Sequence, residues 1–387
     1  MTDRDDRPIA GGPPDPLASP AMTTTASSIA GAATGGPSGS PSGAPSGLDP
    51  EVSQEQLSLT RRLRQPRTIV SIVVPVTIIV IFAWLNRDQL GRVPGLILQA
   101  NPALVVLAFL VFYAGFPLRG FRWARLLRGT GLRIGTRDAT EILFLSWLVN
   151  CIVPAKLGDV YRAWLLKINS TASLSRTFGT VFIERIFDLF TIAILGLAAG
   201  WWSFRDGLPP AIQAVFIVGL IVVAGLGLGL FTMRNFGRRI LTALPLPARL
   251  LELYDRFEEG VFGAVGLRAL PLLGSVTAAI WATESLRLFI VVQALAFPDV
   301  QLGLSGAVFV ALIGSLLTAV PLSPAGLGFV EAGVVGVLTV AYGVPLPEAT
   351  AVALLDRVIS VFSIIVLGSI AYAMSAKPRG AGVIVPA

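Results

Sequence analysis

The chain has 387 residues, of which 54% are hydrophobic and 14% are charged, whereas an average soluble domain is about 25% charged. This composition excludes an ordinary soluble globular protein, because one core cannot enclose so many apolar side chains. Histidine is absent and Cys151 is the single cysteine, which excludes histidine catalysis, an intrachain disulfide and a Cys/His metal site. The net charge of +7 indicates basic loops beside a bilayer rather than a nucleic-acid surface.

The N-terminal region differs in composition from the rest of the chain. Residues 1–60 hold nine of the 27 prolines, together with many Gly, Ser, Ala and Thr residues. Such a segment cannot bury enough apolar surface to fold. No apolar stretch follows Met1, as a cleaved signal peptide would require. The sequence therefore predicts a disordered cytoplasmic tail over residues 1–60 and, at the other end, a short cytoplasmic tail over residues 376–387.

Residues 65–375 predict an all-α polytopic membrane domain, because a spanning helix needs about 20 apolar residues. Six stretches predict full spans: Thr68–Leu85, Ala103–Leu118, Thr177–Trp202, Ala211–Met233, Pro271–Phe297 and Thr350–Met374. Two further apolar stretches, 140–166 and 304–342, each predict two short helices joined by a break, as a re-entrant hairpin or as a pair of short spans. The residues predicted to break them are Pro154, Gly158, Pro321, Pro324, Gly326 and Gly328.

Arginine and lysine positions predict the orientation, because cytoplasmic loops carry an excess of both residues. Basic clusters precede the first span, follow the second, separate the fourth from the fifth and follow the last. We therefore expect both termini in the cytoplasm and the protein in the cell (plasma or inner) membrane. The basic segment 119–137 is partly amphipathic. We expect it to lie along the cytoplasmic face beside anionic lipid, or to serve only as a positive-inside anchor.

The two interrupted stretches resemble each other and predict an internal repeat. Residues 154–160, PAKLGDV, match residues 324–330, PAGLGFV, at Pro, Ala, Leu, Gly and Val. Downstream, Glu184-Arg185 and Asp356-Arg357 each open a spanning helix. These two helices run in opposite directions by the orientation above, so the predicted repeat is inverted. Interrupted segments at matching positions of inverted halves indicate a transporter site near the middle of the membrane, where exposed backbone groups line a cavity.

Charged residues inside apolar spans are candidates for function, since each costs about 2.5–3.5 kcal/mol to insert on the translocon scale. Glu331 has no basic neighbour in sequence, so its partner would come from elsewhere, either Arg287 or Arg357. We expect these charges and one amide to form the substrate-binding set: Asn150, Lys156, Asp159, Arg162, Glu184, Arg185, Asp188, Glu284, Arg287, Glu331, Asp356 and Arg357.

The charges divide into two expected roles. Lys156 and Arg162 flank the first break, and such a basic pair can bind a phosphate, or can instead extend to the membrane interface. Glu331, Asp159 and Glu184 would bind any cationic part of the substrate or carry protons. In the alternative interpretation, the acidic and basic residues neutralise one another and hold the helix bundle together.

Known catalytic motifs are absent. The sequence contains no Walker-type phosphate loop, no dinucleotide-binding fingerprint after a strand and no Gly-x-Ser-x-Gly motif. The sequence predicts no cofactor, no metal and no nucleic-acid partner.

In chain order, the motifs resemble one known family. They are Asn150-x-x-x-Pro154-Ala155-Lys156-Leu157-Gly158-Asp159-x-x-Arg162-Ala163, Glu184-Arg185-x-x-Asp188, Pro324-x-Gly326-Leu327-Gly328-x-x-Glu331 and Arg357. Over about residues 65–375 the chain resembles the lysylphosphatidylglycerol synthase transmembrane region family. The resemblance implies an integral membrane protein that flips lipids. It does not imply synthase activity, because only a short tail stands where fused relatives carry a soluble aminoacyl-transferase domain. Asp159 stands where the family often has Glu.

We therefore expect a lipid flippase or transporter, without enzymatic activity, that moves a phospholipid or a polyprenyl-linked lipid across the cell membrane. Its partners would be anionic or phosphate-bearing membrane lipids, and rocking of the two halves would alternate access to the site. One alternative is a membrane-embedded glycosyl- or aminoacyl-lipid transferase with Asp159 or Glu331 as base. Another is an accessory membrane subunit of such an enzyme. A homo-oligomer or a complex with a lipid-modifying enzyme fits each of these hypotheses.

Overall fold

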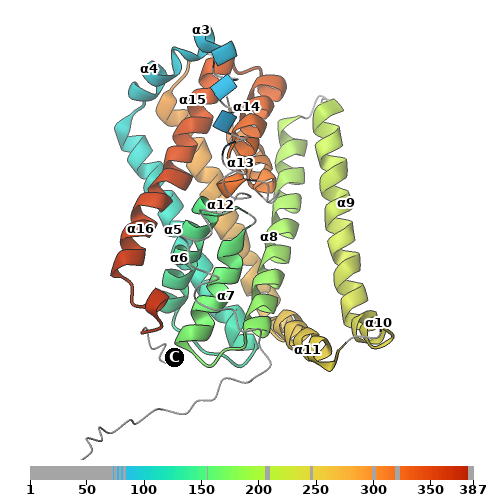
Figure 1. The fold of residues 1–387 in the computed structure, drawn as a ribbon. Helices are drawn as coiled ribbons and strands as arrows, with labels where there is room; N and C mark the ends of the chain where they lie inside the picture. Colours follow the sequence, from blue (N-terminus) through green and yellow to red (C-terminus); the bar gives the residue numbers. More distant parts are fainter. Residues whose placement is uncertain are drawn as a thin grey trace, which may run out of the picture. The chain divides into compact units, whose positions relative to one another are not determined.

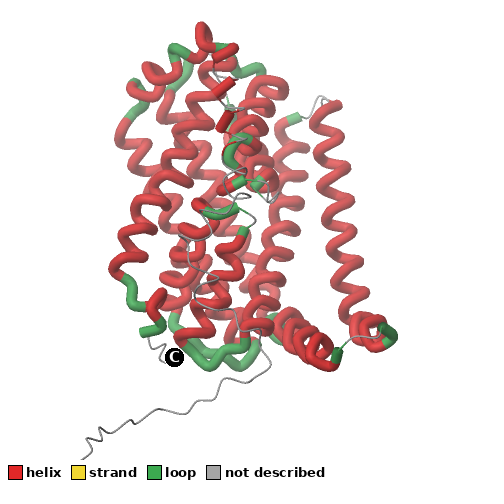
Figure 2. Tube along the Cα trace, in the orientation of Figure 1, coloured by secondary structure: helices red, strands yellow, loops and turns green. Residues whose placement is uncertain are grey.

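Every secondary-structure element in the described part of the chain is helical (Figures 1 and 2). The computed structural model describes scattered residues from 73 to 85 and then residues 86–381, apart from 155, 205–209, 245–246, 299–301 and 319–322. The predicted tail over residues 1–60, most of the predicted span Thr68–Leu85, and Pro321 lie outside the described residues.

Long helices make up most of the membrane domain. Five helical stretches among the described residues are long and apolar enough to cross a bilayer: Pro102–Gly129, Ile217–Thr242, Leu270–Leu295, Pro324–Tyr342 and Leu346–Met374. The helices are α3 (Arg87–Leu90), α4 (Val93–Leu98), α5 (Pro102–Gly129), α6 (Thr136–Ile152), α7 (Leu157–Asn169), α8 (Leu174–Ser203), α9 (Pro210–Thr232), α10 (Arg238–Thr242), α11 (Ala248–Phe262), α12 (Leu270–Leu295), α13 (Leu304–Leu317), α14 (Phe329–Tyr342), α15 (Leu346–Arg357) and α16 (Ser363–Met374). The chain is therefore a polytopic helical membrane protein, as its composition predicts.

The chain leaves the helical conformation within both interrupted stretches. The first break separates α6, which ends at Ile152, from α7, which begins at Leu157. The second separates α13, which ends at Leu317, from α14, which begins at Phe329, and contains the 3₁₀ turn η3 (Pro324–Gly326). Pro at these positions favours such interruptions, since it cannot donate a backbone hydrogen bond and clashes with the preceding turn.

Helices α5 and α12 lie side by side and run in opposite directions (Figure 1). The amide of Asn101, just before α5, donates to the carbonyl of Ala294 near the end of α12 at 2.7 Å. At the other end of α5, Gly129 lies against the carbonyl of Ala264, shortly before α12 begins. Helix α8 and the run from α15 to α16 also have opposite directions in Figure 1. These two pairs of long helices are therefore antiparallel.

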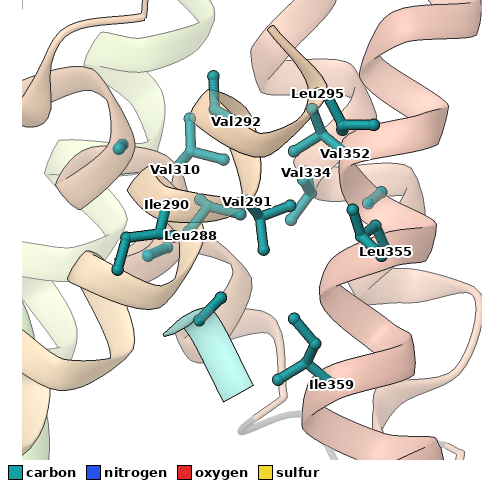
Figure 3. Close-up of a cluster of buried hydrophobic side chains, with 14 of the residues drawn as sticks. Leu288, Ile290, Val291, Val292, Leu295, Val310, Val334, Val352, Leu355 and Ile359 are labelled. Carbon is teal, nitrogen blue, oxygen red and sulfur yellow. The ribbon is translucent and has the colours of Figure 1, made fainter. Parts of the chain in front are cut away.

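Aliphatic side chains from α12, α13, α14 and α15 form the largest buried cluster, part of which is drawn in Figure 3. Its labelled members are Leu288, Ile290, Val291, Val292, Leu295, Val310, Val334, Val352, Leu355 and Ile359. Lipid tails are as apolar as these side chains, so close van der Waals packing, rather than escape from water, stabilises the contacts between these helices. This close packing fixes the position of α12 relative to α15. Both helices also carry charged residues.

The expectation for segment 119–137 is wrong in its first part. Helix α5 continues to Gly129, so Arg119 and Arg122 lie inside a 28-residue helix rather than along the membrane surface. Both side chains are buried, at 5% and 2% exposure. Ion pairs with acidic residues on other helices stabilise them there. Trp123, Leu126 and Leu127 pack into the helix bundle, whereas Phe121 is exposed, so the segment has an amphipathic pattern.

The C-terminal turn η5 (Lys377–Arg379) is attached to the start of α6. Lys377 Nζ lies 2.8 Å from both Asp138 Oδ1 and Glu141 Oε2. The backbone carbonyl of Lys377 accepts a hydrogen bond from the side-chain amide of Asn169 of α7 at 2.9 Å. Burial disfavours the charged lysine, but the hydrogen bonds to Asp138 and Glu141 outweigh burial, so the pKa of Lys377 is raised. This ion pair anchors the end of α16 to α6 and α7.

We expect Lys377→Met to lower the free energy of unfolding at pH 7 by about 1–3 kcal/mol, because charged hydrogen bonds are lost. The pKa of Lys377 is raised by folding, so its stabilisation is complete below the unfolded value of about 10.4 and disappears as pH rises through the folded pKa. Thermal unfolding of the detergent-solubilised protein should show this difference at pH 7 and a smaller one in strong alkali. The exposed Arg133→Met provides the control. A difference that is constant with pH would contradict the assignment.

Candidate functional site

A cavity of about 190 Å³ lies among α5, α6, α8, α12, α13, α14 and α15, next to both helix breaks. Lys156 of the first break lines it, as do Ser323, Ala325 and Gly326 of the second. The charged lining consists of six basic residues, Arg119, Arg122, Lys156, Arg185, Arg287 and Arg357, and four acidic residues, Glu184, Asp188, Glu284 and Asp356. A strongly charged chamber therefore lies inside a bundle of otherwise apolar helices.

The first break places a lysine beside the start of a helix. Lys156 has a left-handed backbone, with φ of +51°, which is unfavourable for a residue that carries a Cβ atom. The amide of Gly158, in the first turn of α7, donates to Asn150 Oδ1 of α6 at 2.8 Å. A Cβ atom on Gly158 would collide with the carbonyl oxygen of Ser146. Glycine at this position therefore lets α7 begin directly against the end of α6.

The second break shares two of these features, a left-handed residue and a glycine amide bound by a side chain. Gly326 and Gly328 have φ of +72° and +86°, and the amide of Gly328 donates to Glu331 Oε2 at 2.7 Å. In the matched motifs, Gly326 corresponds to Lys156 and Gly328 to Gly158. Each break thus has a left-handed residue two positions before a glycine, and a side chain binds the amide of that glycine. Such bonds satisfy backbone donors that a helix start leaves unpaired.

Around the first break, arginines of α5 and α8 pair with carboxylates. Arg185 Nη2 lies 2.8 Å from Asp159 Oδ1 of α7. Arg122 of α5 approaches two acidic residues of α8, with Nη1 2.6 Å from Asp188 Oδ1 and Nη2 3.1 Å from Glu184 Oε1. These pairs connect α5, α7 and α8.

Around the second break, a corresponding set connects α12, α14 and α15. Arg357 Nε lies 2.8 Å from Glu331 Oε1, so Glu331 has one of the two partners that the sequence suggested. Arg287 of α12 pairs with Asp356 Oδ1 at 2.8 Å and with Glu284 Oε2 at 2.7 Å. Asp356 and Arg357 are adjacent in sequence but do not pair with each other; each one neutralises a charge on another helix.

The two sets of ion pairs have the same arrangement, and a hydrogen bond connects them. In each set, the arginine that follows an acidic residue pairs with a carboxylate just after a break: Arg185 with Asp159, and Arg357 with Glu331. Arg119 of α5 donates a hydrogen bond to Glu284 of α12, which connects one set to the other. Removing one partner of such a buried pair leaves an uncompensated charge, at a cost of about 3–5 kcal/mol.

The structure brings most of the predicted binding residues to the cavity. The lining includes Asn150, Lys156, Glu184, Arg185, Asp188, Glu284, Arg287, Asp356 and Arg357. Asp159, Arg162 and Glu331 are not among the lining residues. Asp159 pairs with Arg185, and Glu331 pairs with Arg357, so each carboxylate fixes the position of an arginine that lines the cavity. Pro324 is buried in η3, whereas Pro154 is partly buried in the first break.

Arg162 is enclosed by protein. Its side chain is 1% exposed, and its Nη1 lies 3.3 Å from Glu184 Oε1. The guanidinium carbon lies 4.8 Å from the ring centre of Trp123, a favourable cation–π arrangement. The structure therefore gives Arg162 a role in stabilising Glu184 and α7, and it separates Arg162 from Lys156, the neighbour with which the sequence grouped it.

Two charged lining residues escaped the sequence reasoning, namely Arg119 and Arg122. They belong to a run of arginines that continues into the loop after α5, and such a run is typical of a cytoplasmic loop. A usable signal was their spacing of three residues in α5, which matches the spacing of Glu284 and Arg287 in α12. A charged pair at this spacing lies on one helix face, and both pairs face the cavity.

The charges of the site do not cancel completely. Six arginines, including Arg162, pair with six carboxylates among the described residues. Within that part of the chain, Lys156 Nζ has no carboxylate within ion-pair distance, so the site carries one excess positive charge. Arg119 Nη1 and Arg357 Nη2 are buried and have no hydrogen-bond partner among the described residues. Donors in excess of acceptors favour an anionic ligand.

Each carboxylate of the site is engaged by an arginine, which leaves it poorly suited to bind a cation. Among the described residues, no group of three Asp, Glu or Cys side chains gathers at a position that could hold a metal ion. The chamber therefore offers cationic nitrogens and neutral hydroxyls, such as Ser315, Thr318 and Ser360, to whatever enters it.

Comparison with known proteins places the chain in a family. Residues 69–368 match the profile of the Lysylphosphatidylglycerol synthase TM region family. A UPF0104 membrane protein of Methanocaldococcus jannaschii is 37% identical over 225 residues, which cover 58% of this chain and 92% of that protein. Another, from Methanothermobacter thermautotrophicus, is 25% identical over 312 residues, which cover 76% of this chain and 89% of that protein.

A named enzyme is also similar in sequence. Glycosyltransferase AglD of Haloferax volcanii is 27% identical over 346 residues, which cover 79% of this chain and 54% of AglD. The chain thus spans about half the length of this relative. The profile covers most of the predicted membrane domain and includes both breaks, and it confirms the resemblance found in the motifs. The chain belongs to the lysylphosphatidylglycerol synthase transmembrane region family.

Proposed function

We propose that this protein binds the headgroup of a phosphate-bearing lipid in the charged cavity and moves that lipid across the cell membrane. The observation that carries the proposal is Lys156, a cation in the cavity that is left over when the arginines and carboxylates have paired. A phosphate would neutralise it and accept hydrogen bonds from Arg119 and Arg357. Arginine favours such ligands because its planar donors match phosphate oxygens.

The size of the cavity supports a headgroup rather than a whole lipid as its occupant. An apolar cavity of about 150 Å³ admits one benzene molecule, and pockets for drug-sized ligands are about 300–1,000 Å³. The volume here, about 190 Å³, suits a small polar group whose acyl or prenyl chains remain in the bilayer. Helices α7 and α14 begin beside the cavity and add the positive partial charge of their first turns.

The corresponding breaks and ion pairs support an inverted repeat as the basis of transport. In this proposal, the half from α5 to α8 and the half from α12 to α16 rock around the central cavity and open it alternately to each leaflet. The distribution of arginine and lysine supports cytoplasmic termini, with the ends of α5 and α16 on the cytoplasmic side. Asn150 and Ser323 would contribute neutral contacts to the headgroup from the two breaks.

The similarity to glycosyltransferase AglD favours a second candidate function. In this candidate function, the same cavity holds the phosphate of a polyprenyl-linked lipid, and a separate partner protein is the transferase. Lipid movement by the purified protein alone would support the transporter. Product formation that appears only when a transferase is added, without lipid movement, would support the accessory role.

The first test concerns Lys156. We expect Lys156→Gly to slow translocation of fluorescently labelled phosphatidylglycerol in phosphatidylcholine vesicles by about tenfold, the loss of roughly 1.4 kcal/mol of charged contact. The same variant should be as stable as wild type or more stable by about 1 kcal/mol, because glycine tolerates the left-handed backbone. Lost transport with retained stability separates a ligand contact from a structural one. An unchanged rate would remove Lys156 from the site.

A second test concerns Arg162. We expect Arg162→Gln to lower the free energy of unfolding by about 1–3 kcal/mol, since Glu184 loses one of its two buried arginine partners and keeps Arg122. Translocation per folded molecule should stay within about twofold of wild type, because Arg162 does not line the cavity. Folded protein would be quantified by size-exclusion chromatography before reconstitution. A stable variant that fails to transport phosphatidylglycerol would instead assign Arg162 to the headgroup.

A further inference from the structure

A groove of about 680 Å³ runs between α5 and α6, outside the charged cavity. Its lining consists of Tyr113, Phe116 and Pro117 of α5, and Thr136, Arg137, Thr140, Glu141 and Phe144 of α6. The end near the start of α6 is polar, with Arg137 exposed, and the inner end is aromatic.

The groove and the cavity lie on one continuous face of α6. The groove-lining residues of α6 recur every three or four positions as far as Phe144, and the same spacing continues to Trp147 and Asn150, which line the cavity. Residues three and four apart share a helix face. Between residues 139 and 149, every α6 residue off this face is buried. This face therefore forms a track from the beginning of α6 to the cavity.

A thin aromatic wall separates the two spaces. The ring centre of Phe116 lies 5.0 Å from that of Phe144 on the groove side and 5.2 Å from that of Trp147 on the cavity side. The guanidinium carbon of Arg119 lies 4.9 Å from the ring centre of Trp147. Pro117, next to Phe116, has no amide hydrogen, so α5 lacks one backbone hydrogen bond at this point and bends more readily.

We propose that this groove is the lateral route by which the lipid enters the cavity, with Phe116, Phe144 and Trp147 as the gate. The inference rests on the proposed function. A cavity of about 190 Å³ accepts the headgroup only, so the wall must open sideways to let the chains remain in lipid. The phosphate first meets Arg137, passes Thr136 and Thr140, and reaches Arg119 when the rings part. The acyl chains then lie along the groove.

The test fills the groove in the full-length protein. We expect Thr136→Trp, at the polar end, and Phe144→Trp, beside the gate, each to slow translocation of labelled phosphatidylglycerol by about tenfold, because added bulk obstructs a packed passage. Leu110→Trp is the matched control, since Leu110 lies on α5 outside both spaces and is 57% exposed. Thr136 is exposed, so its substitution leaves the packing of α6 intact.

A second measurement locates the lipid directly. Phosphatidylglycerol with a photoactivatable acyl chain, in phosphatidylcholine vesicles, should label residues 113–117 and 136–144 more than the exposed face of α16 around Val366 and Ile370. Thr136→Trp should reduce that labelling. Wild-type transport in both groove variants, or equal labelling of the two faces, would overturn the route alone. Absence of transport by the wild-type protein would overturn the proposed function and the route with it.

Discussion

Pairing of arginines with carboxylates inside the membrane is the constraint on which the rest of the structure depends. Each charge is costly to place among apolar helices, so each one needs a partner at hydrogen-bond distance. Most partners are on different helices: Arg122 of α5 meets Glu184 and Asp188 of α8, and Arg287 of α12 meets Asp356 of α15. Moving any of these helices alone would separate charges, which links their positions around the cavity.

The same constraint explains why one residue stands out. Lys156 is a non-glycine residue in a left-handed conformation, as is Ala325 at the second break, but only Lys156 of these two carries a charge. Strained backbone of this kind persists where the surrounding structure imposes it, and it is concentrated at functional sites. Lys156 also supplies the positive charge that the ion pairs leave over. Conformational strain and unmatched charge thus coincide at one position beside the cavity, and this coincidence favours a role in anion binding over a role in packing.

Much of the architecture could be predicted from the sequence, because its signals are local. The apolar stretches predict the helices, and the matching PAKLGDV and PAGLGFV segments mark both breaks. The charged residues that line the cavity could be predicted from their positions within apolar stretches. Arg119 and Arg122 are exceptions, because they belong to a basic run that resembles a cytoplasmic loop. Partner choice could not be predicted: Arg162 is enclosed by Glu184 and Trp123, a long-range arrangement that its proximity to Lys156 in sequence conceals.

Protection of the single cysteine would test the central claim most directly. Cys151 lines the cavity at the end of α6, so a small thiol reagent reports whether the cavity is occupied. Phosphatidylglycerol in phosphatidylcholine vesicles should slow labelling of Cys151 by about tenfold relative to vesicles of phosphatidylcholine alone, as expected when a site is about 90% occupied. Lys156→Gly should abolish this protection. Equal labelling rates in the two kinds of vesicle would contradict binding of a phosphate-bearing headgroup in the cavity.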